Sequence, residues 1–359
     1  MTRREESNRY DGEILSGSER TSEKVYYFGM QEGIRLKEML NSACQCSLVS
    51  RVVIFGGTHG NEMSGVALAK HWLKEPSELQ RKTFVAEPCL ANPLAVEKCV
   101  RYVDSDLNRC FSEEILRSPE SESDPYEFIR ARELYQKYGS GSCLYDFIFD
   151  LHNTTSHMGA TLLRCSADDI MSLHLANYLQ SSSGSQSMPC YNYLIDIPKK
   201  DNVYLQNIGK HSLCLELGPQ PQGVTRADVL SRMRELVNCG LDFIDLFNQG
   251  KEFPSFETDI YRVLSRVDYP RDSDGEISAI VHSGLQDKDY VPLKPGHPIF
   301  TTMNGEDLLY DGETVVYPTF INEAAYYEKK VAFISTEKVH LKVPALKLET
   351  GAEHNGTLQ

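Results

Sequence analysis

Apolar and polar positions along residues 51–250 predict strands and helices in alternation. Val52-Val53-Ile54-Phe55 is a β-branched apolar run that ends at a Gly-rich turn, which is typical of a buried strand, and the following residues have helical spacing over 64–73. The clearest helix covers 226–247, where apolar side chains recur every three or four residues on one face. This alternation favours an α/β layer with a largely parallel or mixed sheet.

The remaining segments before residue 250 continue the same pattern. Further helices are predicted over 125–138 and 168–179, the first with Pro in its opening turn. Further strands are predicted over 84–90, 145–151, 160–163, 190–197 and 212–217.

The pattern changes around Asn248-Gln249-Gly250. Beyond this point helical spacing is nearly absent, and short strand-like runs at 277–281, 299–302, 315–321 and 339–343 are broken by Pro and Gly turns. The expected domains are therefore a disordered or loosely attached extension over 1–47 with a short helix near 33–40, an α/β domain over 48–250, a β-rich domain over 251–347 and a flexible tail over 348–359.

Charge and composition limit the partners of the chain. Its 359 residues contain 37 Lys and Arg against 51 Asp and Glu, a net charge of −14 that repels nucleic acid and anionic membranes. The polar first residues and the lack of a long apolar run predict no signal peptide and no transmembrane segment. We expect a cytoplasmic protein with reduced cysteines; peripheral membrane association and homo-oligomerisation stay open.

Candidate metal ligands stand at the ends of two predicted strands. His59 and Glu62 lie in the turn after the first strand, and His152 directly follows the strand that ends at Leu151. A His-x-x-Glu pair is frequent by chance, so the third ligand is what makes this group informative. Three nitrogen and oxygen ligands leave one open position, which is typical of catalytic zinc, and Asp150 would orient His152.

A base and an anion-binding loop accompany these ligands. Glu216 is the one charge in the apolar strand 212–217, and burial there would raise its pKa into the range of a general base. Arg101, Asn108 and Arg109 share a short loop that can bind a carboxylate or stabilise an oxyanion. The structural alternatives are a strand-end salt bridge for Glu216 and a solvated loop with local ion pairs.

In their order along the chain, five motifs resemble those of the aspartoacylase and type-III aminoacylase family of zinc carboxypeptidase-like amidohydrolases. The resemblance covers roughly residues 50 to 340. The motifs are Gly-Gly-Thr-His-Gly-Asn-Glu at 56–62, Asp-Leu-Asn-Arg at 106–109, Asp-Leu-His-Asn-Thr-Thr at 150–155, Glu-Leu-Gly-Pro-Gln-Pro-Gln-Gly at 216–223 and Asn-Glu-Ala-Ala-Tyr-Tyr-Glu-Lys-Lys at 322–330.

This resemblance implies both a fold and a metal centre. The fold would be a zinc carboxypeptidase-like αβα domain with a mixed sheet, followed by a smaller β-rich C-terminal domain that partly covers the site. His59, Glu62 and His152 would hold one Zn²⁺ per subunit. Glu216 would be the general base that later returns the proton to the leaving amine.

The resemblance also implies roles for the residues around the substrate. Arg101 would polarise the scissile carbonyl and stabilise the oxyanion, and Asn108 and Arg109 would hold the α-carboxylate of an N-acyl amino acid. Tyr326 would reach into the site from the C-terminal domain.

Gln206 separates two activities within the family. Aspartoacylases carry an Arg ten residues before the catalytic Glu, where it holds the side-chain carboxylate of the substrate. An amide lacks the charged fork, commonly worth about 1.5–3 kcal/mol per charged hydrogen bond. We therefore expect N-acyl aromatic amino acids and N-acetyl-cysteine S-conjugates (mercapturates) as substrates; Lys330 would partly compensate, so cleavage of N-acetyl-aspartate remains the alternative.

Two other classes of protein fit the sequence less well. A nucleotide-binding module would need a Gly-Lys-Ser/Thr ending or a Gly-x-Gly-x-x-Gly run at the turn near His59, and the sequence has neither. A non-catalytic zinc protein would need neither Glu216 nor Arg101.

Overall fold

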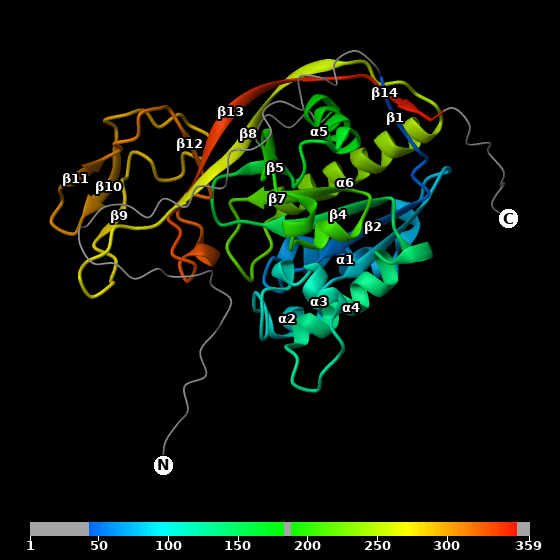
Figure 1. The fold of residues 1–359 in the computed structure, drawn as a ribbon, viewed down its shortest axis with the longest axis horizontal. Coiled ribbons are helices and arrows are strands. Elements are labelled where there is room, and N and C mark those ends of the chain that lie inside the picture. Colours follow the sequence, from blue (N-terminus) through cyan, green and yellow to red (C-terminus); the bar gives the residue numbers. More distant parts are fainter. Residues whose placement is uncertain (1–42, 183–187, 350–359) are drawn as a thin grey trace.

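The computed structural model describes residues 43–182 and 188–349 (Figure 1). The helix expected near 33–40, most of the extension expected over 1–47 and most of the tail expected over 348–359 lie outside the described residues. Strand β1 (Cys44–Cys46) pairs in parallel with β14 (Leu346–Leu348), so the two ends of the described chain lie together. Among the described residues, no helix has the length and apolar character needed to cross a membrane.

A nine-stranded mixed sheet forms the centre of the molecule, in the order β12-β13-β8-β6-β5-β7-β4-β2-β3. Strands β3, β2, β4 and β7 run parallel to one another, whereas β5 is antiparallel to β7. The mixed sheet expected from the sequence is thus confirmed. Its strands are β2 (Arg51–Gly56), β3 (Val85–Leu90), β4 (Phe147–Asn153), β5 (Gly159–Arg164), β6 (Cys190–Leu194), β7 (His211–Gly218), β8 (Phe256–Val267), β12 (Tyr317–Thr319) and β13 (Phe333–Val343).

Helices cover both faces of this sheet. One face packs against α1, α5 and α6 around Trp72, Phe149 and Leu236, and the other packs against α4 around Phe55 and Leu134 (Figure 1). The helices predicted over 64–73, 125–138, 168–179 and 226–247 are confirmed as α1, α4, α5 and α6. The six helices assigned in the described residues are α1 (Met63–Lys74), α2 (Pro93–Lys98), α3 (Glu113–Arg117), α4 (Tyr126–Tyr138), α5 (Ile170–Ser182) and α6 (Ala227–Asn248).

Strands β8 and β13 form a long antiparallel pair that continues the central sheet through β6. The sequence pattern predicted no strand at β8 and only 339–343 of β13. Many side chains of this pair are charged, so the two strands lack the apolar runs from which strands are predicted. The charges are neutralised across the pair by the Arg262–Glu337 and Lys338–Asp259 ion pairs. Pairing between the strands therefore defines them better than apolar runs do.

A smaller three-stranded sheet lies beyond this pair, at the left of Figure 1. It contains β9 (Ala279–Val281), β10 (Pro298–Thr302) and β11 (Asp307–Leu309). The strands predicted over 277–281 and 299–302 are confirmed as β9 and β10. The segment that connects β12 to β13 returns from this region toward the carboxyl ends of β2, β4 and β7, where it borders the cavity described below.

Candidate active site

The turn between β2 and α1 places His59 and Glu62. Gly57 has a φ of +71°, which favours glycine. A Cβ on Gly60 would lie 2.1 Å from the main-chain carbon of Ala95, so this close approach also requires glycine. Glu62 stands directly before α1, and both candidate ligands are buried.

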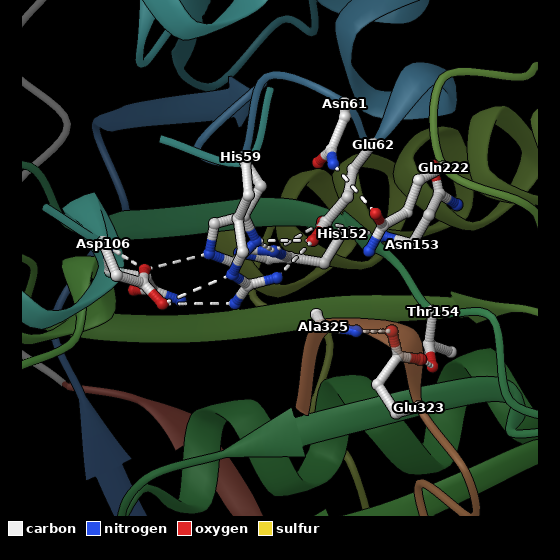
Figure 2. Close-up of polar contacts among 12 residues, drawn as sticks. His59, Asn61, Glu62, Asp106, His152, Asn153, Thr154, Gln222, Glu323 and Ala325 are labelled. Carbon is white, nitrogen blue, oxygen red and sulfur yellow. Dashed lines mark hydrogen bonds and ion pairs between the residues drawn. The ribbon is translucent and has the colours of Figure 1, made fainter. Parts of the chain in front are cut away.

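His152 lies beside these two residues at the end of β4. Its Nδ1 atom is 2.9 Å from Oε2 of Glu62 and 3.1 Å from Nδ1 of His59. Nδ1 of His59 is 2.5 Å from Oε1 of Glu62. Figure 2 shows the three side chains pointing toward one another, so the structure brings the three predicted ligands together.

Two carboxylates hold the far side of the imidazole rings. Nε2 of His152 lies 2.8 Å from Asp150, as the sequence predicts, and Thr58 donates a hydrogen bond of 2.7 Å to the same carboxylate. Nε2 of His59 lies 3.1 Å from Asp106 (Figure 2). The sequence did not reveal this role of Asp106, for which the Asp-Leu-Asn-Arg motif is the one signal.

This arrangement fits a cation. With each Nε2 facing a carboxylate, a neutral imidazole carries its proton on Nε2 and presents a lone pair at Nδ1. The Nδ1 lone pairs of His59 and His152 would then meet each other and the carboxylate of Glu62, which is repulsive unless a positive charge lies among them. The donor set of two imidazole nitrogens and a carboxylate is one that Zn²⁺ favours, with one position left for a further ligand.

The buried charges of this cluster act strongly on one another. Burial opposes ionisation of Glu62, but His59 and His152 outweigh it and hold the pKa of this carboxyl well below its usual range. Burial likewise opposes protonation of His152, yet Asp150 and Glu62 raise its pKa well above that of a free histidine. A bound metal would have to displace that proton.

Glu216 lies next to His152 because β7 pairs with β4 in a register that places these two residues opposite each other. Burial is the largest influence on its carboxyl, and the negative charge of Glu62 adds to it, so that the pKa of Glu216 rises to about 8. The raised pKa that the sequence predicts is confirmed, and it suits a group that accepts and returns a proton.

The loop before and around Asp106 places Arg101 against the metal ligands. Its Nη1 donates to Oε1 of Glu62 at 3.2 Å, and its Nη2 donates to Asp106 at 3.3 Å. Burial opposes the charge of Arg101, but the carboxylates of Asp106 and Glu62 raise its pKa above the ordinary arginine value. The guanidinium of Arg101 is therefore positively charged and lies beside the candidate metal site.

Asn108 and Arg109 border the same cavity. Oδ1 of Asn108 accepts a hydrogen bond of 2.9 Å from the main-chain N–H of Leu205, and the Arg109 guanidinium lies 4.6 Å from the centre of the Tyr204 ring. These contacts fix the two side chains, and both line the cavity into which the candidate ligands project.

The cavity has a volume of about 340 Å³ and contains polar and apolar walls. Gln206 and Tyr326 both line it, as expected. Lys330, which we expected to compensate for Gln206, is instead exposed and does not line the cavity. Its neighbour Lys329 does, and its Nζ lies 2.7 Å from Asp106. The chain turns at Lys330, whose φ is +55°, so the two adjacent lysines lie in different surroundings.

Glu323 connects the segment between β12 and β13 to the loop that follows β4. This buried carboxylate accepts a hydrogen bond from the hydroxyl of Thr154 (Figure 2). It also accepts one, at 2.7 Å, from the main-chain N–H of Thr155. Its other oxygen accepts from the N–H of Ala325 at 3.1 Å, one residue before Tyr326. The role of Glu323 is not evident from the sequence, because its partners Thr154 and Thr155 lie far away in the chain.

Both parts of the chain match profiles of one known family. A family profile described as the succinylglutamate desuccinylase/aspartoacylase catalytic domain matches residues 49–244, and the barrel-sandwich hybrid domain of the same family matches 256–338. The chain is 66% identical over 310 residues to an N-acyl-aromatic-L-amino acid amidohydrolase (carboxylate-forming) of Xenopus tropicalis, covering 86% of this chain and 100% of that protein.

Two further relatives complete the comparison. An aspartoacylase of Danio rerio is 48% identical over 299 residues, covering 83% of this chain and 94% of that protein. The crystal structure of murine aminoacylase 3 superposes with a TM-score of 0.81 at 51% identity, covering 84% of this chain and 100% of that one. The chain is thus more similar to the aromatic amidohydrolase than to this aspartoacylase.

Proposed function

The chain belongs to the succinylglutamate desuccinylase/aspartoacylase family, and we propose that it is a zinc-dependent amidohydrolase of N-acyl-L-amino acids with a preference for aromatic side chains. The products are a carboxylate and the free amino acid. N-acetyl-cysteine S-conjugates belong to the same proposed substrate class because they present a bulky apolar side chain.

His59, Glu62 and His152 are the residues that would hold one Zn²⁺ per subunit. When bound, zinc would supply a Lewis acid beside the scissile amide. The protein contributes the fixed orientation of both imidazoles, since Asp106 and Asp150 lie at hydrogen-bonding distance from their Nε2 atoms.

Glu216 is the proposed general base. Its ionised carboxylate takes a proton from the attacking water and then gives it to the nitrogen of the leaving amine. Arg101, which donates a hydrogen bond to Glu62, stabilises the negative charge that develops on the carbonyl oxygen. Asn108 and Arg109 hold the α-carboxylate, which aligns the amide bond with Glu216.

The observation that carries the aromatic preference is the apolar part of the cavity wall. Beside the charged cluster, the lining includes Leu163, Tyr193, Ile195, Val263 and Phe320. These side chains offer contact area to an aromatic ring, whereas a side-chain carboxylate would lose its hydration against them.

Gln206 supports the same preference. Its side chain is buried, lines the cavity and accepts a hydrogen bond of 3.0 Å from the thiol of Cys165. A neutral amide at this position cannot balance the charge of an aspartate substrate.

The second candidate function is cleavage of N-acetyl-L-aspartate, which the proximity of Arg101, Arg109 and Lys329 in one cavity favours. A comparison of kcat/KM for N-acetyl-tyrosine and N-acetyl-aspartate on the zinc-loaded protein separates the two activities. We expect N-acetyl-tyrosine to be the better substrate. A higher value for N-acetyl-aspartate would contradict the aromatic preference.

Replacing Gln206 with Arg sharpens this test. The new guanidinium should raise the ratio of kcat/KM for N-acetyl-aspartate over N-acetyl-tyrosine by roughly tenfold or more, because a charged hydrogen bond contributes about 1.5–3 kcal/mol. Gln206→Leu is the matched control, since it changes the side chain without adding charge and should leave N-acetyl-aspartate a poor substrate. An unchanged ratio in the Arg variant would show that this position does not set specificity.

A further inference from the structure

Arg266 differs from the other positively charged residues that line the substrate cavity. Arg101 and Lys329 both bind the carboxylate of Asp106, and Arg109 is the proposed partner of the substrate α-carboxylate. Arg266 lines the same cavity, but its side chain is exposed and makes no hydrogen bond or ion pair with another residue that the structure describes. The proposed reaction gives this positive charge no role.

A β-bulge in β8 turns Arg266 toward the cavity. Two residues of β8, Val263 and Ser265, pair with adjacent residues of β13, which leaves Leu264 as an extra residue. One extra residue reverses the side of the sheet to which the later side chains of a strand point. Arg266 therefore shares a side with Val263 instead of with Leu264.

The packing on the two sides of β8 agrees with this reversal. Val263 packs against an apolar cluster that borders the cavity, whereas Leu264 and Val267 both pack against the separate cluster around β9 and β10. Ile334, which lies opposite Arg266 in the register, also lines the cavity. Because residues directly opposite each other point to the same side of a sheet, the side chain of Arg266 projects toward the cavity.

An apolar floor of the cavity leads from Glu216 toward β8. Leu163 of β5 lies between Cys214 of β7 and Tyr193 of β6 in the register. The next strand, β8, contributes Val263 to the same cavity. At a strand spacing of about 4.8 Å, the three intervals from β7 to β8 correspond to roughly 14 Å. A long substrate side chain that starts beside Glu216 and follows this floor therefore extends toward β8.

We propose that Arg266 determines specificity for the far end of the substrate and favours N-acyl amino acids whose aromatic or S-linked side chain ends in a carboxylate. This inference rests on the proposed function, which places the scissile amide beside Glu216 and the side chain on the apolar floor. A carboxylate close to the amide would lose its hydration against the floor, whereas one at the far end would meet the exposed guanidinium and keep its contact with water.

Two substrates of similar shape and different charge test this proposal on the zinc-loaded protein. N-acetyl-4-carboxyphenylalanine ends in a carboxylate, and N-acetyl-4-carbamoylphenylalanine ends in a neutral amide of similar size. We expect the ratio of kcat/KM for the acid over the amide to fall by roughly twofold to fivefold in Arg266→Gln, as expected for an ion pair open to solvent. Added salt should lower the ratio of the unmodified protein toward that of the variant.

Arg262→Gln is the matched control for this variant. Arg262 also belongs to β8, but it is paired with Glu337 and does not line the cavity, so its replacement should leave the ratio unchanged. An equal loss of kcat/KM for both substrates in Arg266→Gln would show that Arg266 only packs against the ring. An unchanged ratio in Arg266→Gln would show that its charge does not act on the substrate. Either result would overturn the proposal.

Hydrolysis of N-acetyl-tyrosine separates this inference from the proposed function. If the unmodified protein hydrolyses N-acetyl-tyrosine and Arg266→Gln leaves the ratio of acid over amide unchanged, only the role of Arg266 is wrong. If the unmodified protein hydrolyses none of the three N-acyl amino acids, the proposed function is wrong and the inference falls with it.

Discussion

The active site consists of two halves that the sequence encodes in different ways. The strand-end half contains His59, Glu62, His152 and Glu216, at or just beyond the carboxyl ends of β2, β4 and β7, together with the loop 101–109 that contacts them. The C-terminal half contains Glu323, Tyr326 and Lys329, in the segment between β12 and β13. The strand-end half supplies the proposed ligands and base, whereas the C-terminal half completes the cavity and holds parts of the strand-end half in place.

The contact between Lys329 and Asp106 shows how the halves depend on each other. Asp106 lies 3.1 Å from His59 and at the same time 2.7 Å from Lys329, which is 223 residues away in the chain. A residue of the C-terminal half therefore fixes the carboxylate that orients a proposed metal ligand. We infer that chemistry resides in the strand-end half and that the C-terminal half tunes it, and this division predicts effects of different size.

The largest effect is expected in the strand-end half. Glu216→Ala removes the proposed base and should lower kcat for N-acetyl-tyrosine by roughly 10²- to 10⁴-fold, the usual contribution of general acid–base catalysis. Zinc content should stay at the level of the unmodified protein, because Glu216 is not among the proposed ligands. Both quantities follow from steady-state kinetics and metal analysis of the same preparation; unaltered turnover would refute the mechanism.

A smaller effect is expected where the halves meet. Lys329→Met removes one of the two cations that hold Asp106, the other being Arg101. Residues that orient metal ligands typically contribute 10- to 100-fold to metal affinity or activity. We expect weaker zinc binding in a competition titration with a chelator, together with lower kcat/KM. Lys330→Met is the matched control, since this neighbouring lysine is exposed and should behave as the unmodified protein. Equal zinc affinity and equal kcat/KM in the two variants would show that Lys329 does not support the metal site.

The smallest effect on rate is expected from Glu323→Gln. The variant should lose about 1.5–3 kcal/mol of unfolding free energy in urea, the usual contribution of a charged hydrogen bond, because Glu323 binds Thr154 and Thr155. The exposed residue Glu313 provides the control variant Glu313→Gln.

The same variant makes a prediction about pH. The negative charge of Glu323 contributes to the raised pKa of Glu216, so its removal should lower that pKa. Since Glu216 acts as a base only when ionised, the acidic limb of the kcat/KM profile should move to lower pH. A shift to higher pH would contradict the assigned interaction between the two carboxyl groups.

The sequence predicted the strand-end half well because its signals are local. His59 and Glu62 share one turn, His152 follows one apolar strand and Glu216 is the one charge in another, so strand prediction alone places them at one edge of a sheet. The helices α1 and α6 were likewise evident from their spacing.

Strand β8 and the C-terminal half of the site were predicted less well because their contacts are long-range. Strand β8 alternates charged and apolar residues whose partners lie on β13, which a single segment does not reveal. In the same way, nothing near Lys329 or Glu323 indicates that one reaches Asp106 and the other reaches Thr154. From the sequence alone, Lys329 and Lys330 are therefore equally good candidates for a lysine that lines the substrate cavity.

A zinc titration of the metal-free protein tests the central claim most directly. Rising amounts of zinc should restore hydrolysis of N-acetyl-tyrosine in proportion to the metal added, and activity should level off at one zinc per chain. His152→Ala, measured alongside, should give no recovery over the same range. Full activity without metal, or full recovery in the His152 variant, would contradict a catalytic zinc held by His59, Glu62 and His152.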